Sequence, residues 1–116
     1  MLLHFCKSKI NRVFVTEAEL HYEGSITIDS DLLKAADILE GEKVEVLNLN
    51  NGNRFETYAI NGKPGSGEIC LNGPAARMGL VGDQIIVLCY VLLTPEEAKK
   101  NKIKVVRVDN KNRIKK

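Results

Sequence analysis

The residues with the clearest chemical potential in this chain are Gly24 and Ser25, which stand between two segments that read as β-strands. Glycine lacks a Cβ, so Gly24 tolerates a tight bend and offers its carbonyl unhindered to the next hydroxyl. Attack by Ser25 Oγ would turn the amide into an ester. Elimination across the Ser25 Cα–Cβ bond would then break the chain, and hydrolysis of the dehydroalanine would leave a pyruvoyl group. The same dipeptide also occurs in ordinary turns.

A pyruvoyl group would act as a built-in cofactor, because its ketone forms imines with amines and withdraws electrons. Chemistry of this kind on a substrate that carries a carboxylate would also need a cation for that carboxylate and an acid that returns a proton to carbon. Arg54 and Tyr58 fit these two roles. Their spacing puts them on one face of a predicted strand, with Cα atoms about 13 Å apart. Taken alone, the same strand pattern fits a packed Tyr58 and a solvated Arg54.

Short motifs on both sides of Gly24-Ser25 occur together in one family. In chain order they are Lys9-Ile10-Asn11-Arg12, Val15-Thr16, Leu20-His21-Tyr22, Ser25-Ile26-Thr27-Ile28-Asp29, Asn51-Gly52-Asn53-Arg54-Phe55, Thr57-Tyr58-Ala59-Ile60, Asn72-Gly73, Ala75-Ala76 and Val81-Gly82-Asp83. From about Leu3 to Asp109 the chain resembles aspartate 1-decarboxylase, a pyruvoyl enzyme family that makes β-alanine for pantothenate synthesis. It departs from the family at Asn11, usually histidine, and at Pro74, often alanine.

The resemblance implies a proenzyme that cleaves itself between Gly24 and Ser25 into chains 1–24 and 25–116. The long chain would begin with a pyruvoyl group derived from Ser25, which forms a Schiff base with L-aspartate. The products would be β-alanine and carbon dioxide, with neither pyridoxal phosphate nor a metal required. The family is also a homotetramer with its sites between subunits, so we expect the same assembly here.

The resemblance further implies roles for residues around the site. Tyr58 would donate the proton, while Lys9 and Arg54 would bind the substrate. Thr57 would take part in both self-cleavage and substrate binding, although strict strand alternation turns it away from Tyr58. That tension would be resolved by the twist of a barrel or by a neighbouring subunit.

The segment that begins with Asn72 supplies the remaining candidates. An asparagine amide can stabilise the oxyanion that forms when the serine attacks, so Asn72 is expected to assist self-cleavage. Gly73, Pro74 and Ala75 would contact the substrate. The backbone N–H groups of Gly73 and Ala75 could hold a carboxylate at a helix N-terminus, whereas Pro74 has no N–H to donate. An Asn-Gly pair by itself is equally typical of a turn.

The composition predicts one domain over residues 1–116 with an aliphatic core, because the chain is short and lacks tryptophan. The charges that sum to the net charge of +2 are distributed unevenly along the chain. Residues 99–116 carry nine basic residues and one acid, and residues 1–98 carry eight basic residues and fourteen acids. A basic tail can bind nucleic acid, but no aromatic residue is interleaved there, so a solvated terminal segment is favoured and no nucleic-acid partner is expected. The alternative function is a non-catalytic small β-barrel that binds a partner through this tail.

Cysteine and histidine usage indicates a reducing compartment and no metal site. Cys6, Cys70 and Cys89 are odd in number and lack C-x-x-C spacing, so they read as small buried residues. His4 and His21 have no partner at metal-ligand spacing. Because the longest apolar run covers nine residues, no membrane span or signal peptide is expected, and the protein is predicted to be cytoplasmic.

The pattern of β-branched residues and turns predicts a mainly β fold. Strands are expected at 2–6, 12–16, 25–28, 43–48, 54–60, 68–71, 85–93 and 103–108, with short helices at 32–36, 74–78 and after the capping box that starts at Thr94. The segment 39–47 aligns with 80–88 at an offset of 41 residues. Such duplication suits a closed barrel of two similar halves. The resemblance implies a six-stranded double-psi β-barrel.

Overall fold

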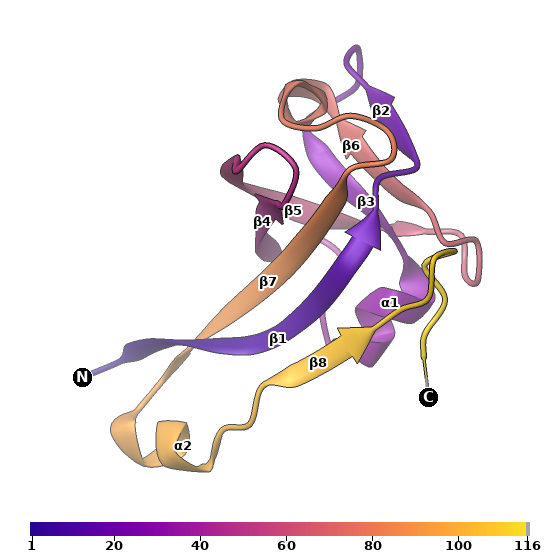
Figure 1. Cartoon of the computed structure of the whole chain (residues 1–116). Helices are drawn as coiled ribbons and strands as arrows, with labels where there is room; N and C mark the ends of the chain where they lie inside the picture. The colour runs from indigo at the N-terminus through magenta and orange to yellow at the C-terminus, as the bar shows by residue number, and fades with distance from the viewer. Residues whose placement is uncertain (116) are drawn as a thin grey trace.

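The computed structural model describes residues 1–115, in which eight strands, two short α-helices and one 3-10 helix build a mainly β fold (Figure 1). The elements in chain order are β1 (Leu3–Phe14), β2 (Glu17–Glu19), β3 (Ser25–Asp29), α1 (Ser30–Ala35), β4 (Lys43–Asn48), β5 (Arg54–Gly62), β6 (Ile69–Asn72), η1 (Gly73–Arg77), β7 (Gln84–Leu93), α2 (Pro95–Lys100) and β8 (Lys104–Arg107).

The sheet closes on itself where β1 passes into β2. The strand order is β2-β6-β3-β5-β4-β7-β1-β8, so two consecutive strands lie near opposite ends of it. Thr16 makes this junction, because its N–H donates to the Ile69 carbonyl at 2.8 Å and its Oγ1 accepts from the Ile69 N–H at 2.9 Å. With β1 and β2 counted as one bent strand, the barrel has the six strands expected, and β8 adds to the outer side of β1.

The N-terminal region differs from the sequence-based prediction. Residues 2–6 and 12–16 were predicted as separate strands, but β1 runs without a break through the polar residues between them. Its partners explain the continuity, since β7 pairs with it on one side and β8 on the other. Two register shifts, at Cys6/Ser8 and Ile10/Val13, accommodate the bend that this long strand needs. The short β2 was not predicted.

The internal repeat has the same local geometry in both copies. Gly41 and Gly82 adopt φ values of 90° and 95°, which an L residue with a side chain would adopt only under strain. The Glu42 carboxylate accepts from the backbone N–H three residues earlier at 3.0 Å, and the Asp83 carboxylate does the same at 2.9 Å. Both turns then lead directly into a strand, β4 or β7. The duplication predicted from the sequence is therefore structural.

Each glycine-acid turn is also hydrogen-bonded to a strand from elsewhere in the barrel. The turn at Gly41 exchanges two backbone hydrogen bonds with Ala59, at 2.8 and 3.1 Å. The turn at Gly82 exchanges two with Val15, at 2.8 and 2.9 Å. These two matching contacts, which we call the turn clasps, hold β5 and the end of β1 in equivalent positions.

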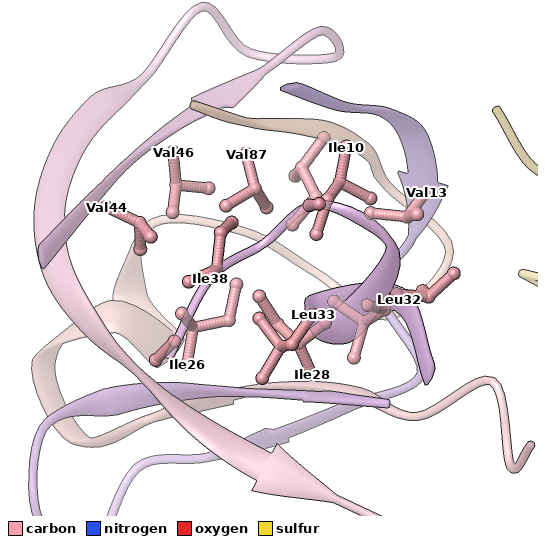
Figure 2. Packing of buried hydrophobic residues seen from close by; sticks show 14 of the residues in the cluster. Ile10, Val13, Ile26, Ile28, Leu32, Leu33, Ile38, Val44, Val46 and Val87 are labelled. Carbon is pink, nitrogen blue, oxygen red and sulfur yellow. The ribbon is translucent and has the colours of Figure 1, made fainter. Parts of the chain in front are cut away.

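Aliphatic side chains fill the barrel, as the absence of tryptophan predicted. They point toward one another from α1 and from strands on all sides of the interior (Figure 2). The labelled members are Ile10, Val13, Ile26, Ile28, Leu32, Leu33, Ile38, Val44, Val46 and Val87, each at most 4% exposed. Full burial of such a side chain stabilises the fold by about 1.5–3 kcal/mol.

The basic segment at the C-terminus is folded for most of its length. The capping box at Thr94 is present, with Glu97 N–H donating to the threonine hydroxyl at 3.2 Å, and it begins α2. β8 pairs in parallel with β1. Beyond it, the buried Asn112 amide donates to the carbonyls of Phe14 and Gly67 at 2.8 and 2.9 Å. The segment thus forms the predicted strand against β1, while its described basic side chains remain exposed to solvent, as expected. The helices within residues 1–115 are all too short and too polar to cross a membrane.

Asp29, at the end of β3, connects this strand to the start of α1 and to the loop before β6 through side-chain hydrogen bonds. It is 2% exposed, and its carboxylate accepts from the N–H groups of Asp31, Gly65 and Gly67 at 2.8, 3.0 and 2.9 Å. One of these bonds caps the N-terminus of α1, and the other two fix the loop before β6. Since Asn72 lies at the far end of β6, this carboxylate helps to set the register of the site strands.

We expect Asp29→Ala to lower the free energy of unfolding by about 3 kcal/mol, because three charge-assisted hydrogen bonds and a helix cap are lost. Urea unfolding at fixed protein concentration measures the change. Asp31→Ala removes a neighbouring exposed carboxylate and should cost only about 0.5 kcal/mol. Equal losses for the two variants would contradict the structural role of Asp29.

Candidate functional site

Ser25 is the first residue of β3, a strand that lies between β5 and β6 in the sheet. The residue has no exposed surface. Across the antiparallel β3–β6 pair its register partner is Asn72, the last residue of β6. The fold thus brings the two together from 47 residues apart in the chain, as self-cleavage would require.

The Asn72 side chain donates directly to the serine hydroxyl. Its Nδ2 lies 2.9 Å from Ser25 Oγ and 2.9 Å from Thr27 Oγ1. Its Oδ1 accepts from the Cys70 thiol at 3.1 Å. Asn72 is itself only 3% exposed, so these bonds are made away from bulk water. A buried amide donor at this position can stabilise negative charge as it develops on an oxygen.

The glycine after Asn72 packs against the backbone on the N-terminal side of Ser25. Gly73 has φ of +63°, and a Cβ placed there would lie 2.5 Å from the Tyr22 carbonyl oxygen and 3.0 Å from Gly24 Cα. A Cβ on Gly24 would in turn lie 3.4 Å from Pro74 Cδ. A glycine is therefore needed at position 73 for the close approach of two backbone segments, a stronger reason than a simple Asn-Gly turn.

A pocket of about 350 Å³ opens beside the Gly24–Ser25 bond, with the buried Ser25 at its floor. Its walls come from β5 and from the start of η1. The lining residues are Gly24, Ser25, Phe55, Glu56, Thr57, Pro74, Ala75 and Met78. Of the candidates from the sequence, Thr57, Pro74 and Ala75 thus share one pocket with the Gly-Ser bond, and a small diacid is of a size to enter it.

The remaining candidates lie elsewhere on the same chain. Arg54 and Tyr58 lie on β5 on the same exposed face as the pocket residue Glu56, but neither of them lines the pocket. Arg54 pairs there with Glu45, with Nη1 and Oε1 3.1 Å apart. Tyr58 is 41% exposed. Lys9 lies on β1 opposite Leu88 of β7, and it too is outside the pocket lining. Among the described residues, Lys9, Arg54 and Tyr58 are thus outside the pocket lining, although Tyr58 directly precedes Ala59, the register partner of Ile26 next to Ser25.

Sequence reasoning did not single out Thr27 or Cys70, although both contact Asn72. A signal was available, because side chains two apart on a strand share a face. Thr27 follows Ser25 by two residues on β3, and Cys70 precedes Asn72 by two on β6. Burial raises the pKa of the Cys70 thiol to about 11, with the nearby acids Glu17 and Glu68 adding to the effect. At neutral pH this side chain is therefore a thiol with a proton to donate.

The other ionisable groups form no comparable cluster around Ser25. Burial, followed by the neighbouring Glu42, raises the pKa of the Cys89 thiol to about 12. This thiol lies 3.2 Å from Glu42 Oε2, which also pairs with Lys7 at 2.8 Å. Among residues 1–115, no three His, Cys, Asp or Glu side chains come together in a way that could hold a metal ion.

Comparison with protein families gives one match that covers almost the whole chain. The family model described as "Aspartate decarboxylase" matches residues 1–115. Several curated relatives carry the name "Aspartate 1-decarboxylase". The one from Caldicellulosiruptor saccharolyticus is 60% identical over 114 residues, covering 98% of this chain and 89% of its own. The one from Chloroherpeton thalassium is 60% identical over 116 residues, covering 100% of this chain and 85% of its own.

A solved structure supports the fold. The crystal structure of the rationally designed protein mkDPBB_sym_86 matches with a TM-score of 0.50 and 18% identity, over 70% of this chain and 94% of that protein. At this level of identity the match concerns architecture alone. It agrees with the double-psi β-barrel that the sequence predicted.

Proposed function

This chain belongs to the aspartate decarboxylase family, and we propose that it converts L-aspartate to β-alanine and carbon dioxide, for pantothenate synthesis, after cleaving itself between Gly24 and Ser25. The single observation that carries the proposal is the 2.9 Å hydrogen bond from Asn72 Nδ2 to the buried Ser25 Oγ, at a Gly-Ser bond that borders a pocket. Few other roles explain a hydroxyl held in this way next to two closely packed glycines.

Self-cleavage follows from the groups around this bond. Ser25 Oγ attacks the Gly24 carbonyl carbon, and the Ser25 nitrogen departs from that carbon with the serine proton, which leaves an ester. Loss of the Ser25 α-proton then expels the Gly24 carboxylate, which ends chain 1–24. Water replaces the nitrogen on residue 25 and releases one ammonia. Asn72 can stabilise the negative charge that develops on Ser25 Oγ as it loses its proton in the first step, and Thr57 lines the same pocket.

The residues at this position fit a pyruvoyl group, because Ser25 supplies its carbon atoms and the space beside Gly24 is free of side chains other than Pro74. When present, such a group supplies an electron sink for decarboxylation. Asn72, Thr57 and Ala75 would surround it. Their part is to hold the reacting end of the substrate in a pocket from which bulk water is largely displaced, while charged groups bind the other end.

The substrate-binding groups are proposed to come from a second subunit. Arg54 and Tyr58 are exposed on β5 and do not line the pocket at Ser25, so their side chains are accessible to a neighbouring subunit. A homotetramer with sites between subunits would bring Lys9, Arg54 and Tyr58 of one chain to the pocket of its neighbour. Arg54 would then bind the substrate carboxylate, which a guanidinium does with two parallel hydrogen bonds, and Tyr58 would donate the proton to carbon.

The alternative function was a barrel that binds a partner through a basic tail and performs no chemistry. The family match over residues 1–115 favours the enzyme, and the basic segment is occupied in forming α2 and β8. A denaturing gel separates the two functions, because the enzyme yields two fragments where a binding module stays whole.

Ser25→Ala should give a folded, uncleaved chain of 116 residues with no decarboxylase activity, because Ser25 supplies both the attacking hydroxyl and the precursor of the pyruvoyl group. Intact mass spectrometry is the measurement. In the unmutated protein the long chain should be lighter by one ammonia than a fragment beginning with serine. Ser8→Ala removes another buried serine hydroxyl, one without a hydrogen-bond partner among the described residues, and should still be cleaved. Turnover by the Ser25 variant would overturn the assignment.

Tyr58→Phe should leave self-cleavage intact and reduce turnover by about 100- to 10,000-fold, the usual contribution of a general acid. The ring and its packing remain, and only the proton is lost. Steady-state rates of β-alanine formation give the answer. Tyr90→Phe is the matched control, since Tyr90 is similarly exposed at 43% and should keep its activity within about threefold. If turnover by Tyr58→Phe also stayed within about threefold of the unmutated chain, Tyr58 would be a packing residue and not the proton donor.

Co-expression of Ser25→Ala and Tyr58→Phe chains should restore activity, although each variant alone has almost none. If one chain supplies Ser25 and its neighbour supplies Tyr58, random assembly gives about a quarter of sites with both native residues. Activity of the purified mixed oligomer per site tests this expectation. No recovery in an assembly shown to contain both chains would mean that both residues act within one chain.

A further inference from the structure

Two side chains that the proposed mechanism does not use lie two residues further along the site strands, Thr27 on β3 and Cys70 on β6. Cys70 and Thr27 are register partners across β6 and β3, and both contact the Asn72 amide. The set of four residues Ser25, Thr27, Cys70 and Asn72 is called the Asn72 network below. Ser25, Cys70 and Asn72 are each no more than 3% exposed, so these contacts are not exchanged freely with water.

We propose that Cys70 and Thr27 are positioning residues for self-cleavage, which hold the Asn72 amide with its nitrogen toward Ser25 Oγ. This inference rests on the proposed function, because it assigns the control of the same cleavage reaction. Neither residue touches the Gly24 carbonyl in this role. Both act through Asn72.

The orientation of the amide is decided by what lies on its oxygen side. A side-chain amide has two N–H donors on one side and an acceptor oxygen on the other. Ser25 and Thr27 carry hydroxyls, which accept or donate equally well, so they would tolerate either orientation. The Cys70 thiol lies 3.1 Å from Asn72 Oδ1 and has a proton to donate, whereas its sulfur is only a weak acceptor for an N–H group. Cys70 is therefore the member of the network that favours the orientation observed.

This orientation suits the chemistry of the first step. With Asn72 as donor, Ser25 Oγ accepts a hydrogen bond and keeps its own proton free for the group that removes it. As the serine oxygen loses that proton, the Asn72 N–H already points at the developing negative charge. With the amide reversed, the serine would donate to Asn72 Oδ1, which is no base, and the oxygen would lose its stabilising donor.

Thr27 completes the arrangement from the other side. Asn72 Nδ2 has two hydrogens, and Thr27 Oγ1 accepts the one that Ser25 does not, at 2.9 Å. A buried N–H left without an acceptor is costly, so loss of this hydroxyl would weaken the preference for the observed orientation. Both N–H groups and the oxygen of the Asn72 amide therefore each have a hydrogen-bond partner within the network.

The test is the rate of self-cleavage in variants that remove or keep each hydrogen bond. Chains are made by cell-free translation, and conversion of the full chain into 1–24 and 25–116 is followed by intact mass spectrometry. Cys70→Ala should slow cleavage about five- to tenfold, the effect expected from one lost buried hydrogen bond. Cys70→Ser keeps a donor but introduces a hydroxyl that also accepts, so its cleavage rate should lie between that of Cys70→Ala and that of the unmutated chain.

A matched control separates the hydrogen bond from the loss of a buried thiol as such. Cys89 is equally buried, and its thiol lies beside Glu42 and not beside Asn72. Cys89→Ala should therefore leave the cleavage rate within about twofold. Thr27→Val, which keeps the shape but removes the hydroxyl, should slow cleavage, and Thr27→Ser should restore it. Thermal unfolding of each variant in a Ser25→Ala background confirms that the chains are folded.

A double-mutant cycle with Asn72 gives the decisive readout, because a purely structural role would not depend on Asn72. In an Asn72→Ala background, Cys70→Ala should have no further effect on the cleavage rate. Equal slowing in both backgrounds, or equal slowing by Cys70→Ala and Cys70→Ser, would overturn the positioning role. These results differ from failure of the proposed function, in which the unmutated chain itself would show no cleavage at all.

Discussion

Closure of the barrel by the two turn clasps is the constraint on which the rest of the structure depends. A six-stranded barrel leaves no free edge only if both ends of the sheet meet, and here the meeting point is the bend between β1 and β2. The clasp of Val15 by the Gly82 turn fixes that bend, and the clasp of Ala59 by the Gly41 turn fixes β5. Positive φ at both glycines is what allows each turn to approach its strand.

This closure has a direct consequence for chemistry, because it sets the register of β3 between β5 and β6. The register places Ser25 opposite Asn72 and brings Gly73 against the backbone at Gly24. On β5, Thr57 lines the Ser25 pocket, whereas Arg54 and Tyr58 are exposed and outside its lining. A single chain thus holds the groups proposed for self-cleavage, while the groups proposed for substrate lie on its outer surface. Division of the two reactions in this way suits an enzyme whose sites lie between subunits.

The environment of the serine also differs from that of an ordinary catalytic hydroxyl. No surface of Ser25 is exposed, and its hydrogen-bonding partner is an amide donor where a hydrolase would place a base. Such a site fits the proposed single reaction on its own backbone. The high pKa of the Cys70 thiol, raised by burial to about 11, fits this setting, because a neutral donor behind Asn72 keeps the amide in one orientation.

The sequence by itself determined the family, most strand positions, the duplicated glycine-acid turn and the Gly-Ser pair, since these depend on local residue types and their order. It failed where a residue's role depends on a neighbour distant in the chain. The polar middle of β1 is extended because β7 and β8 flank it. Likewise the contacts of Thr27 and Cys70 with Asn72 arise only from the register of β3 with β6. Pairing register is a property of the closed sheet, so only the tertiary structure could decide it.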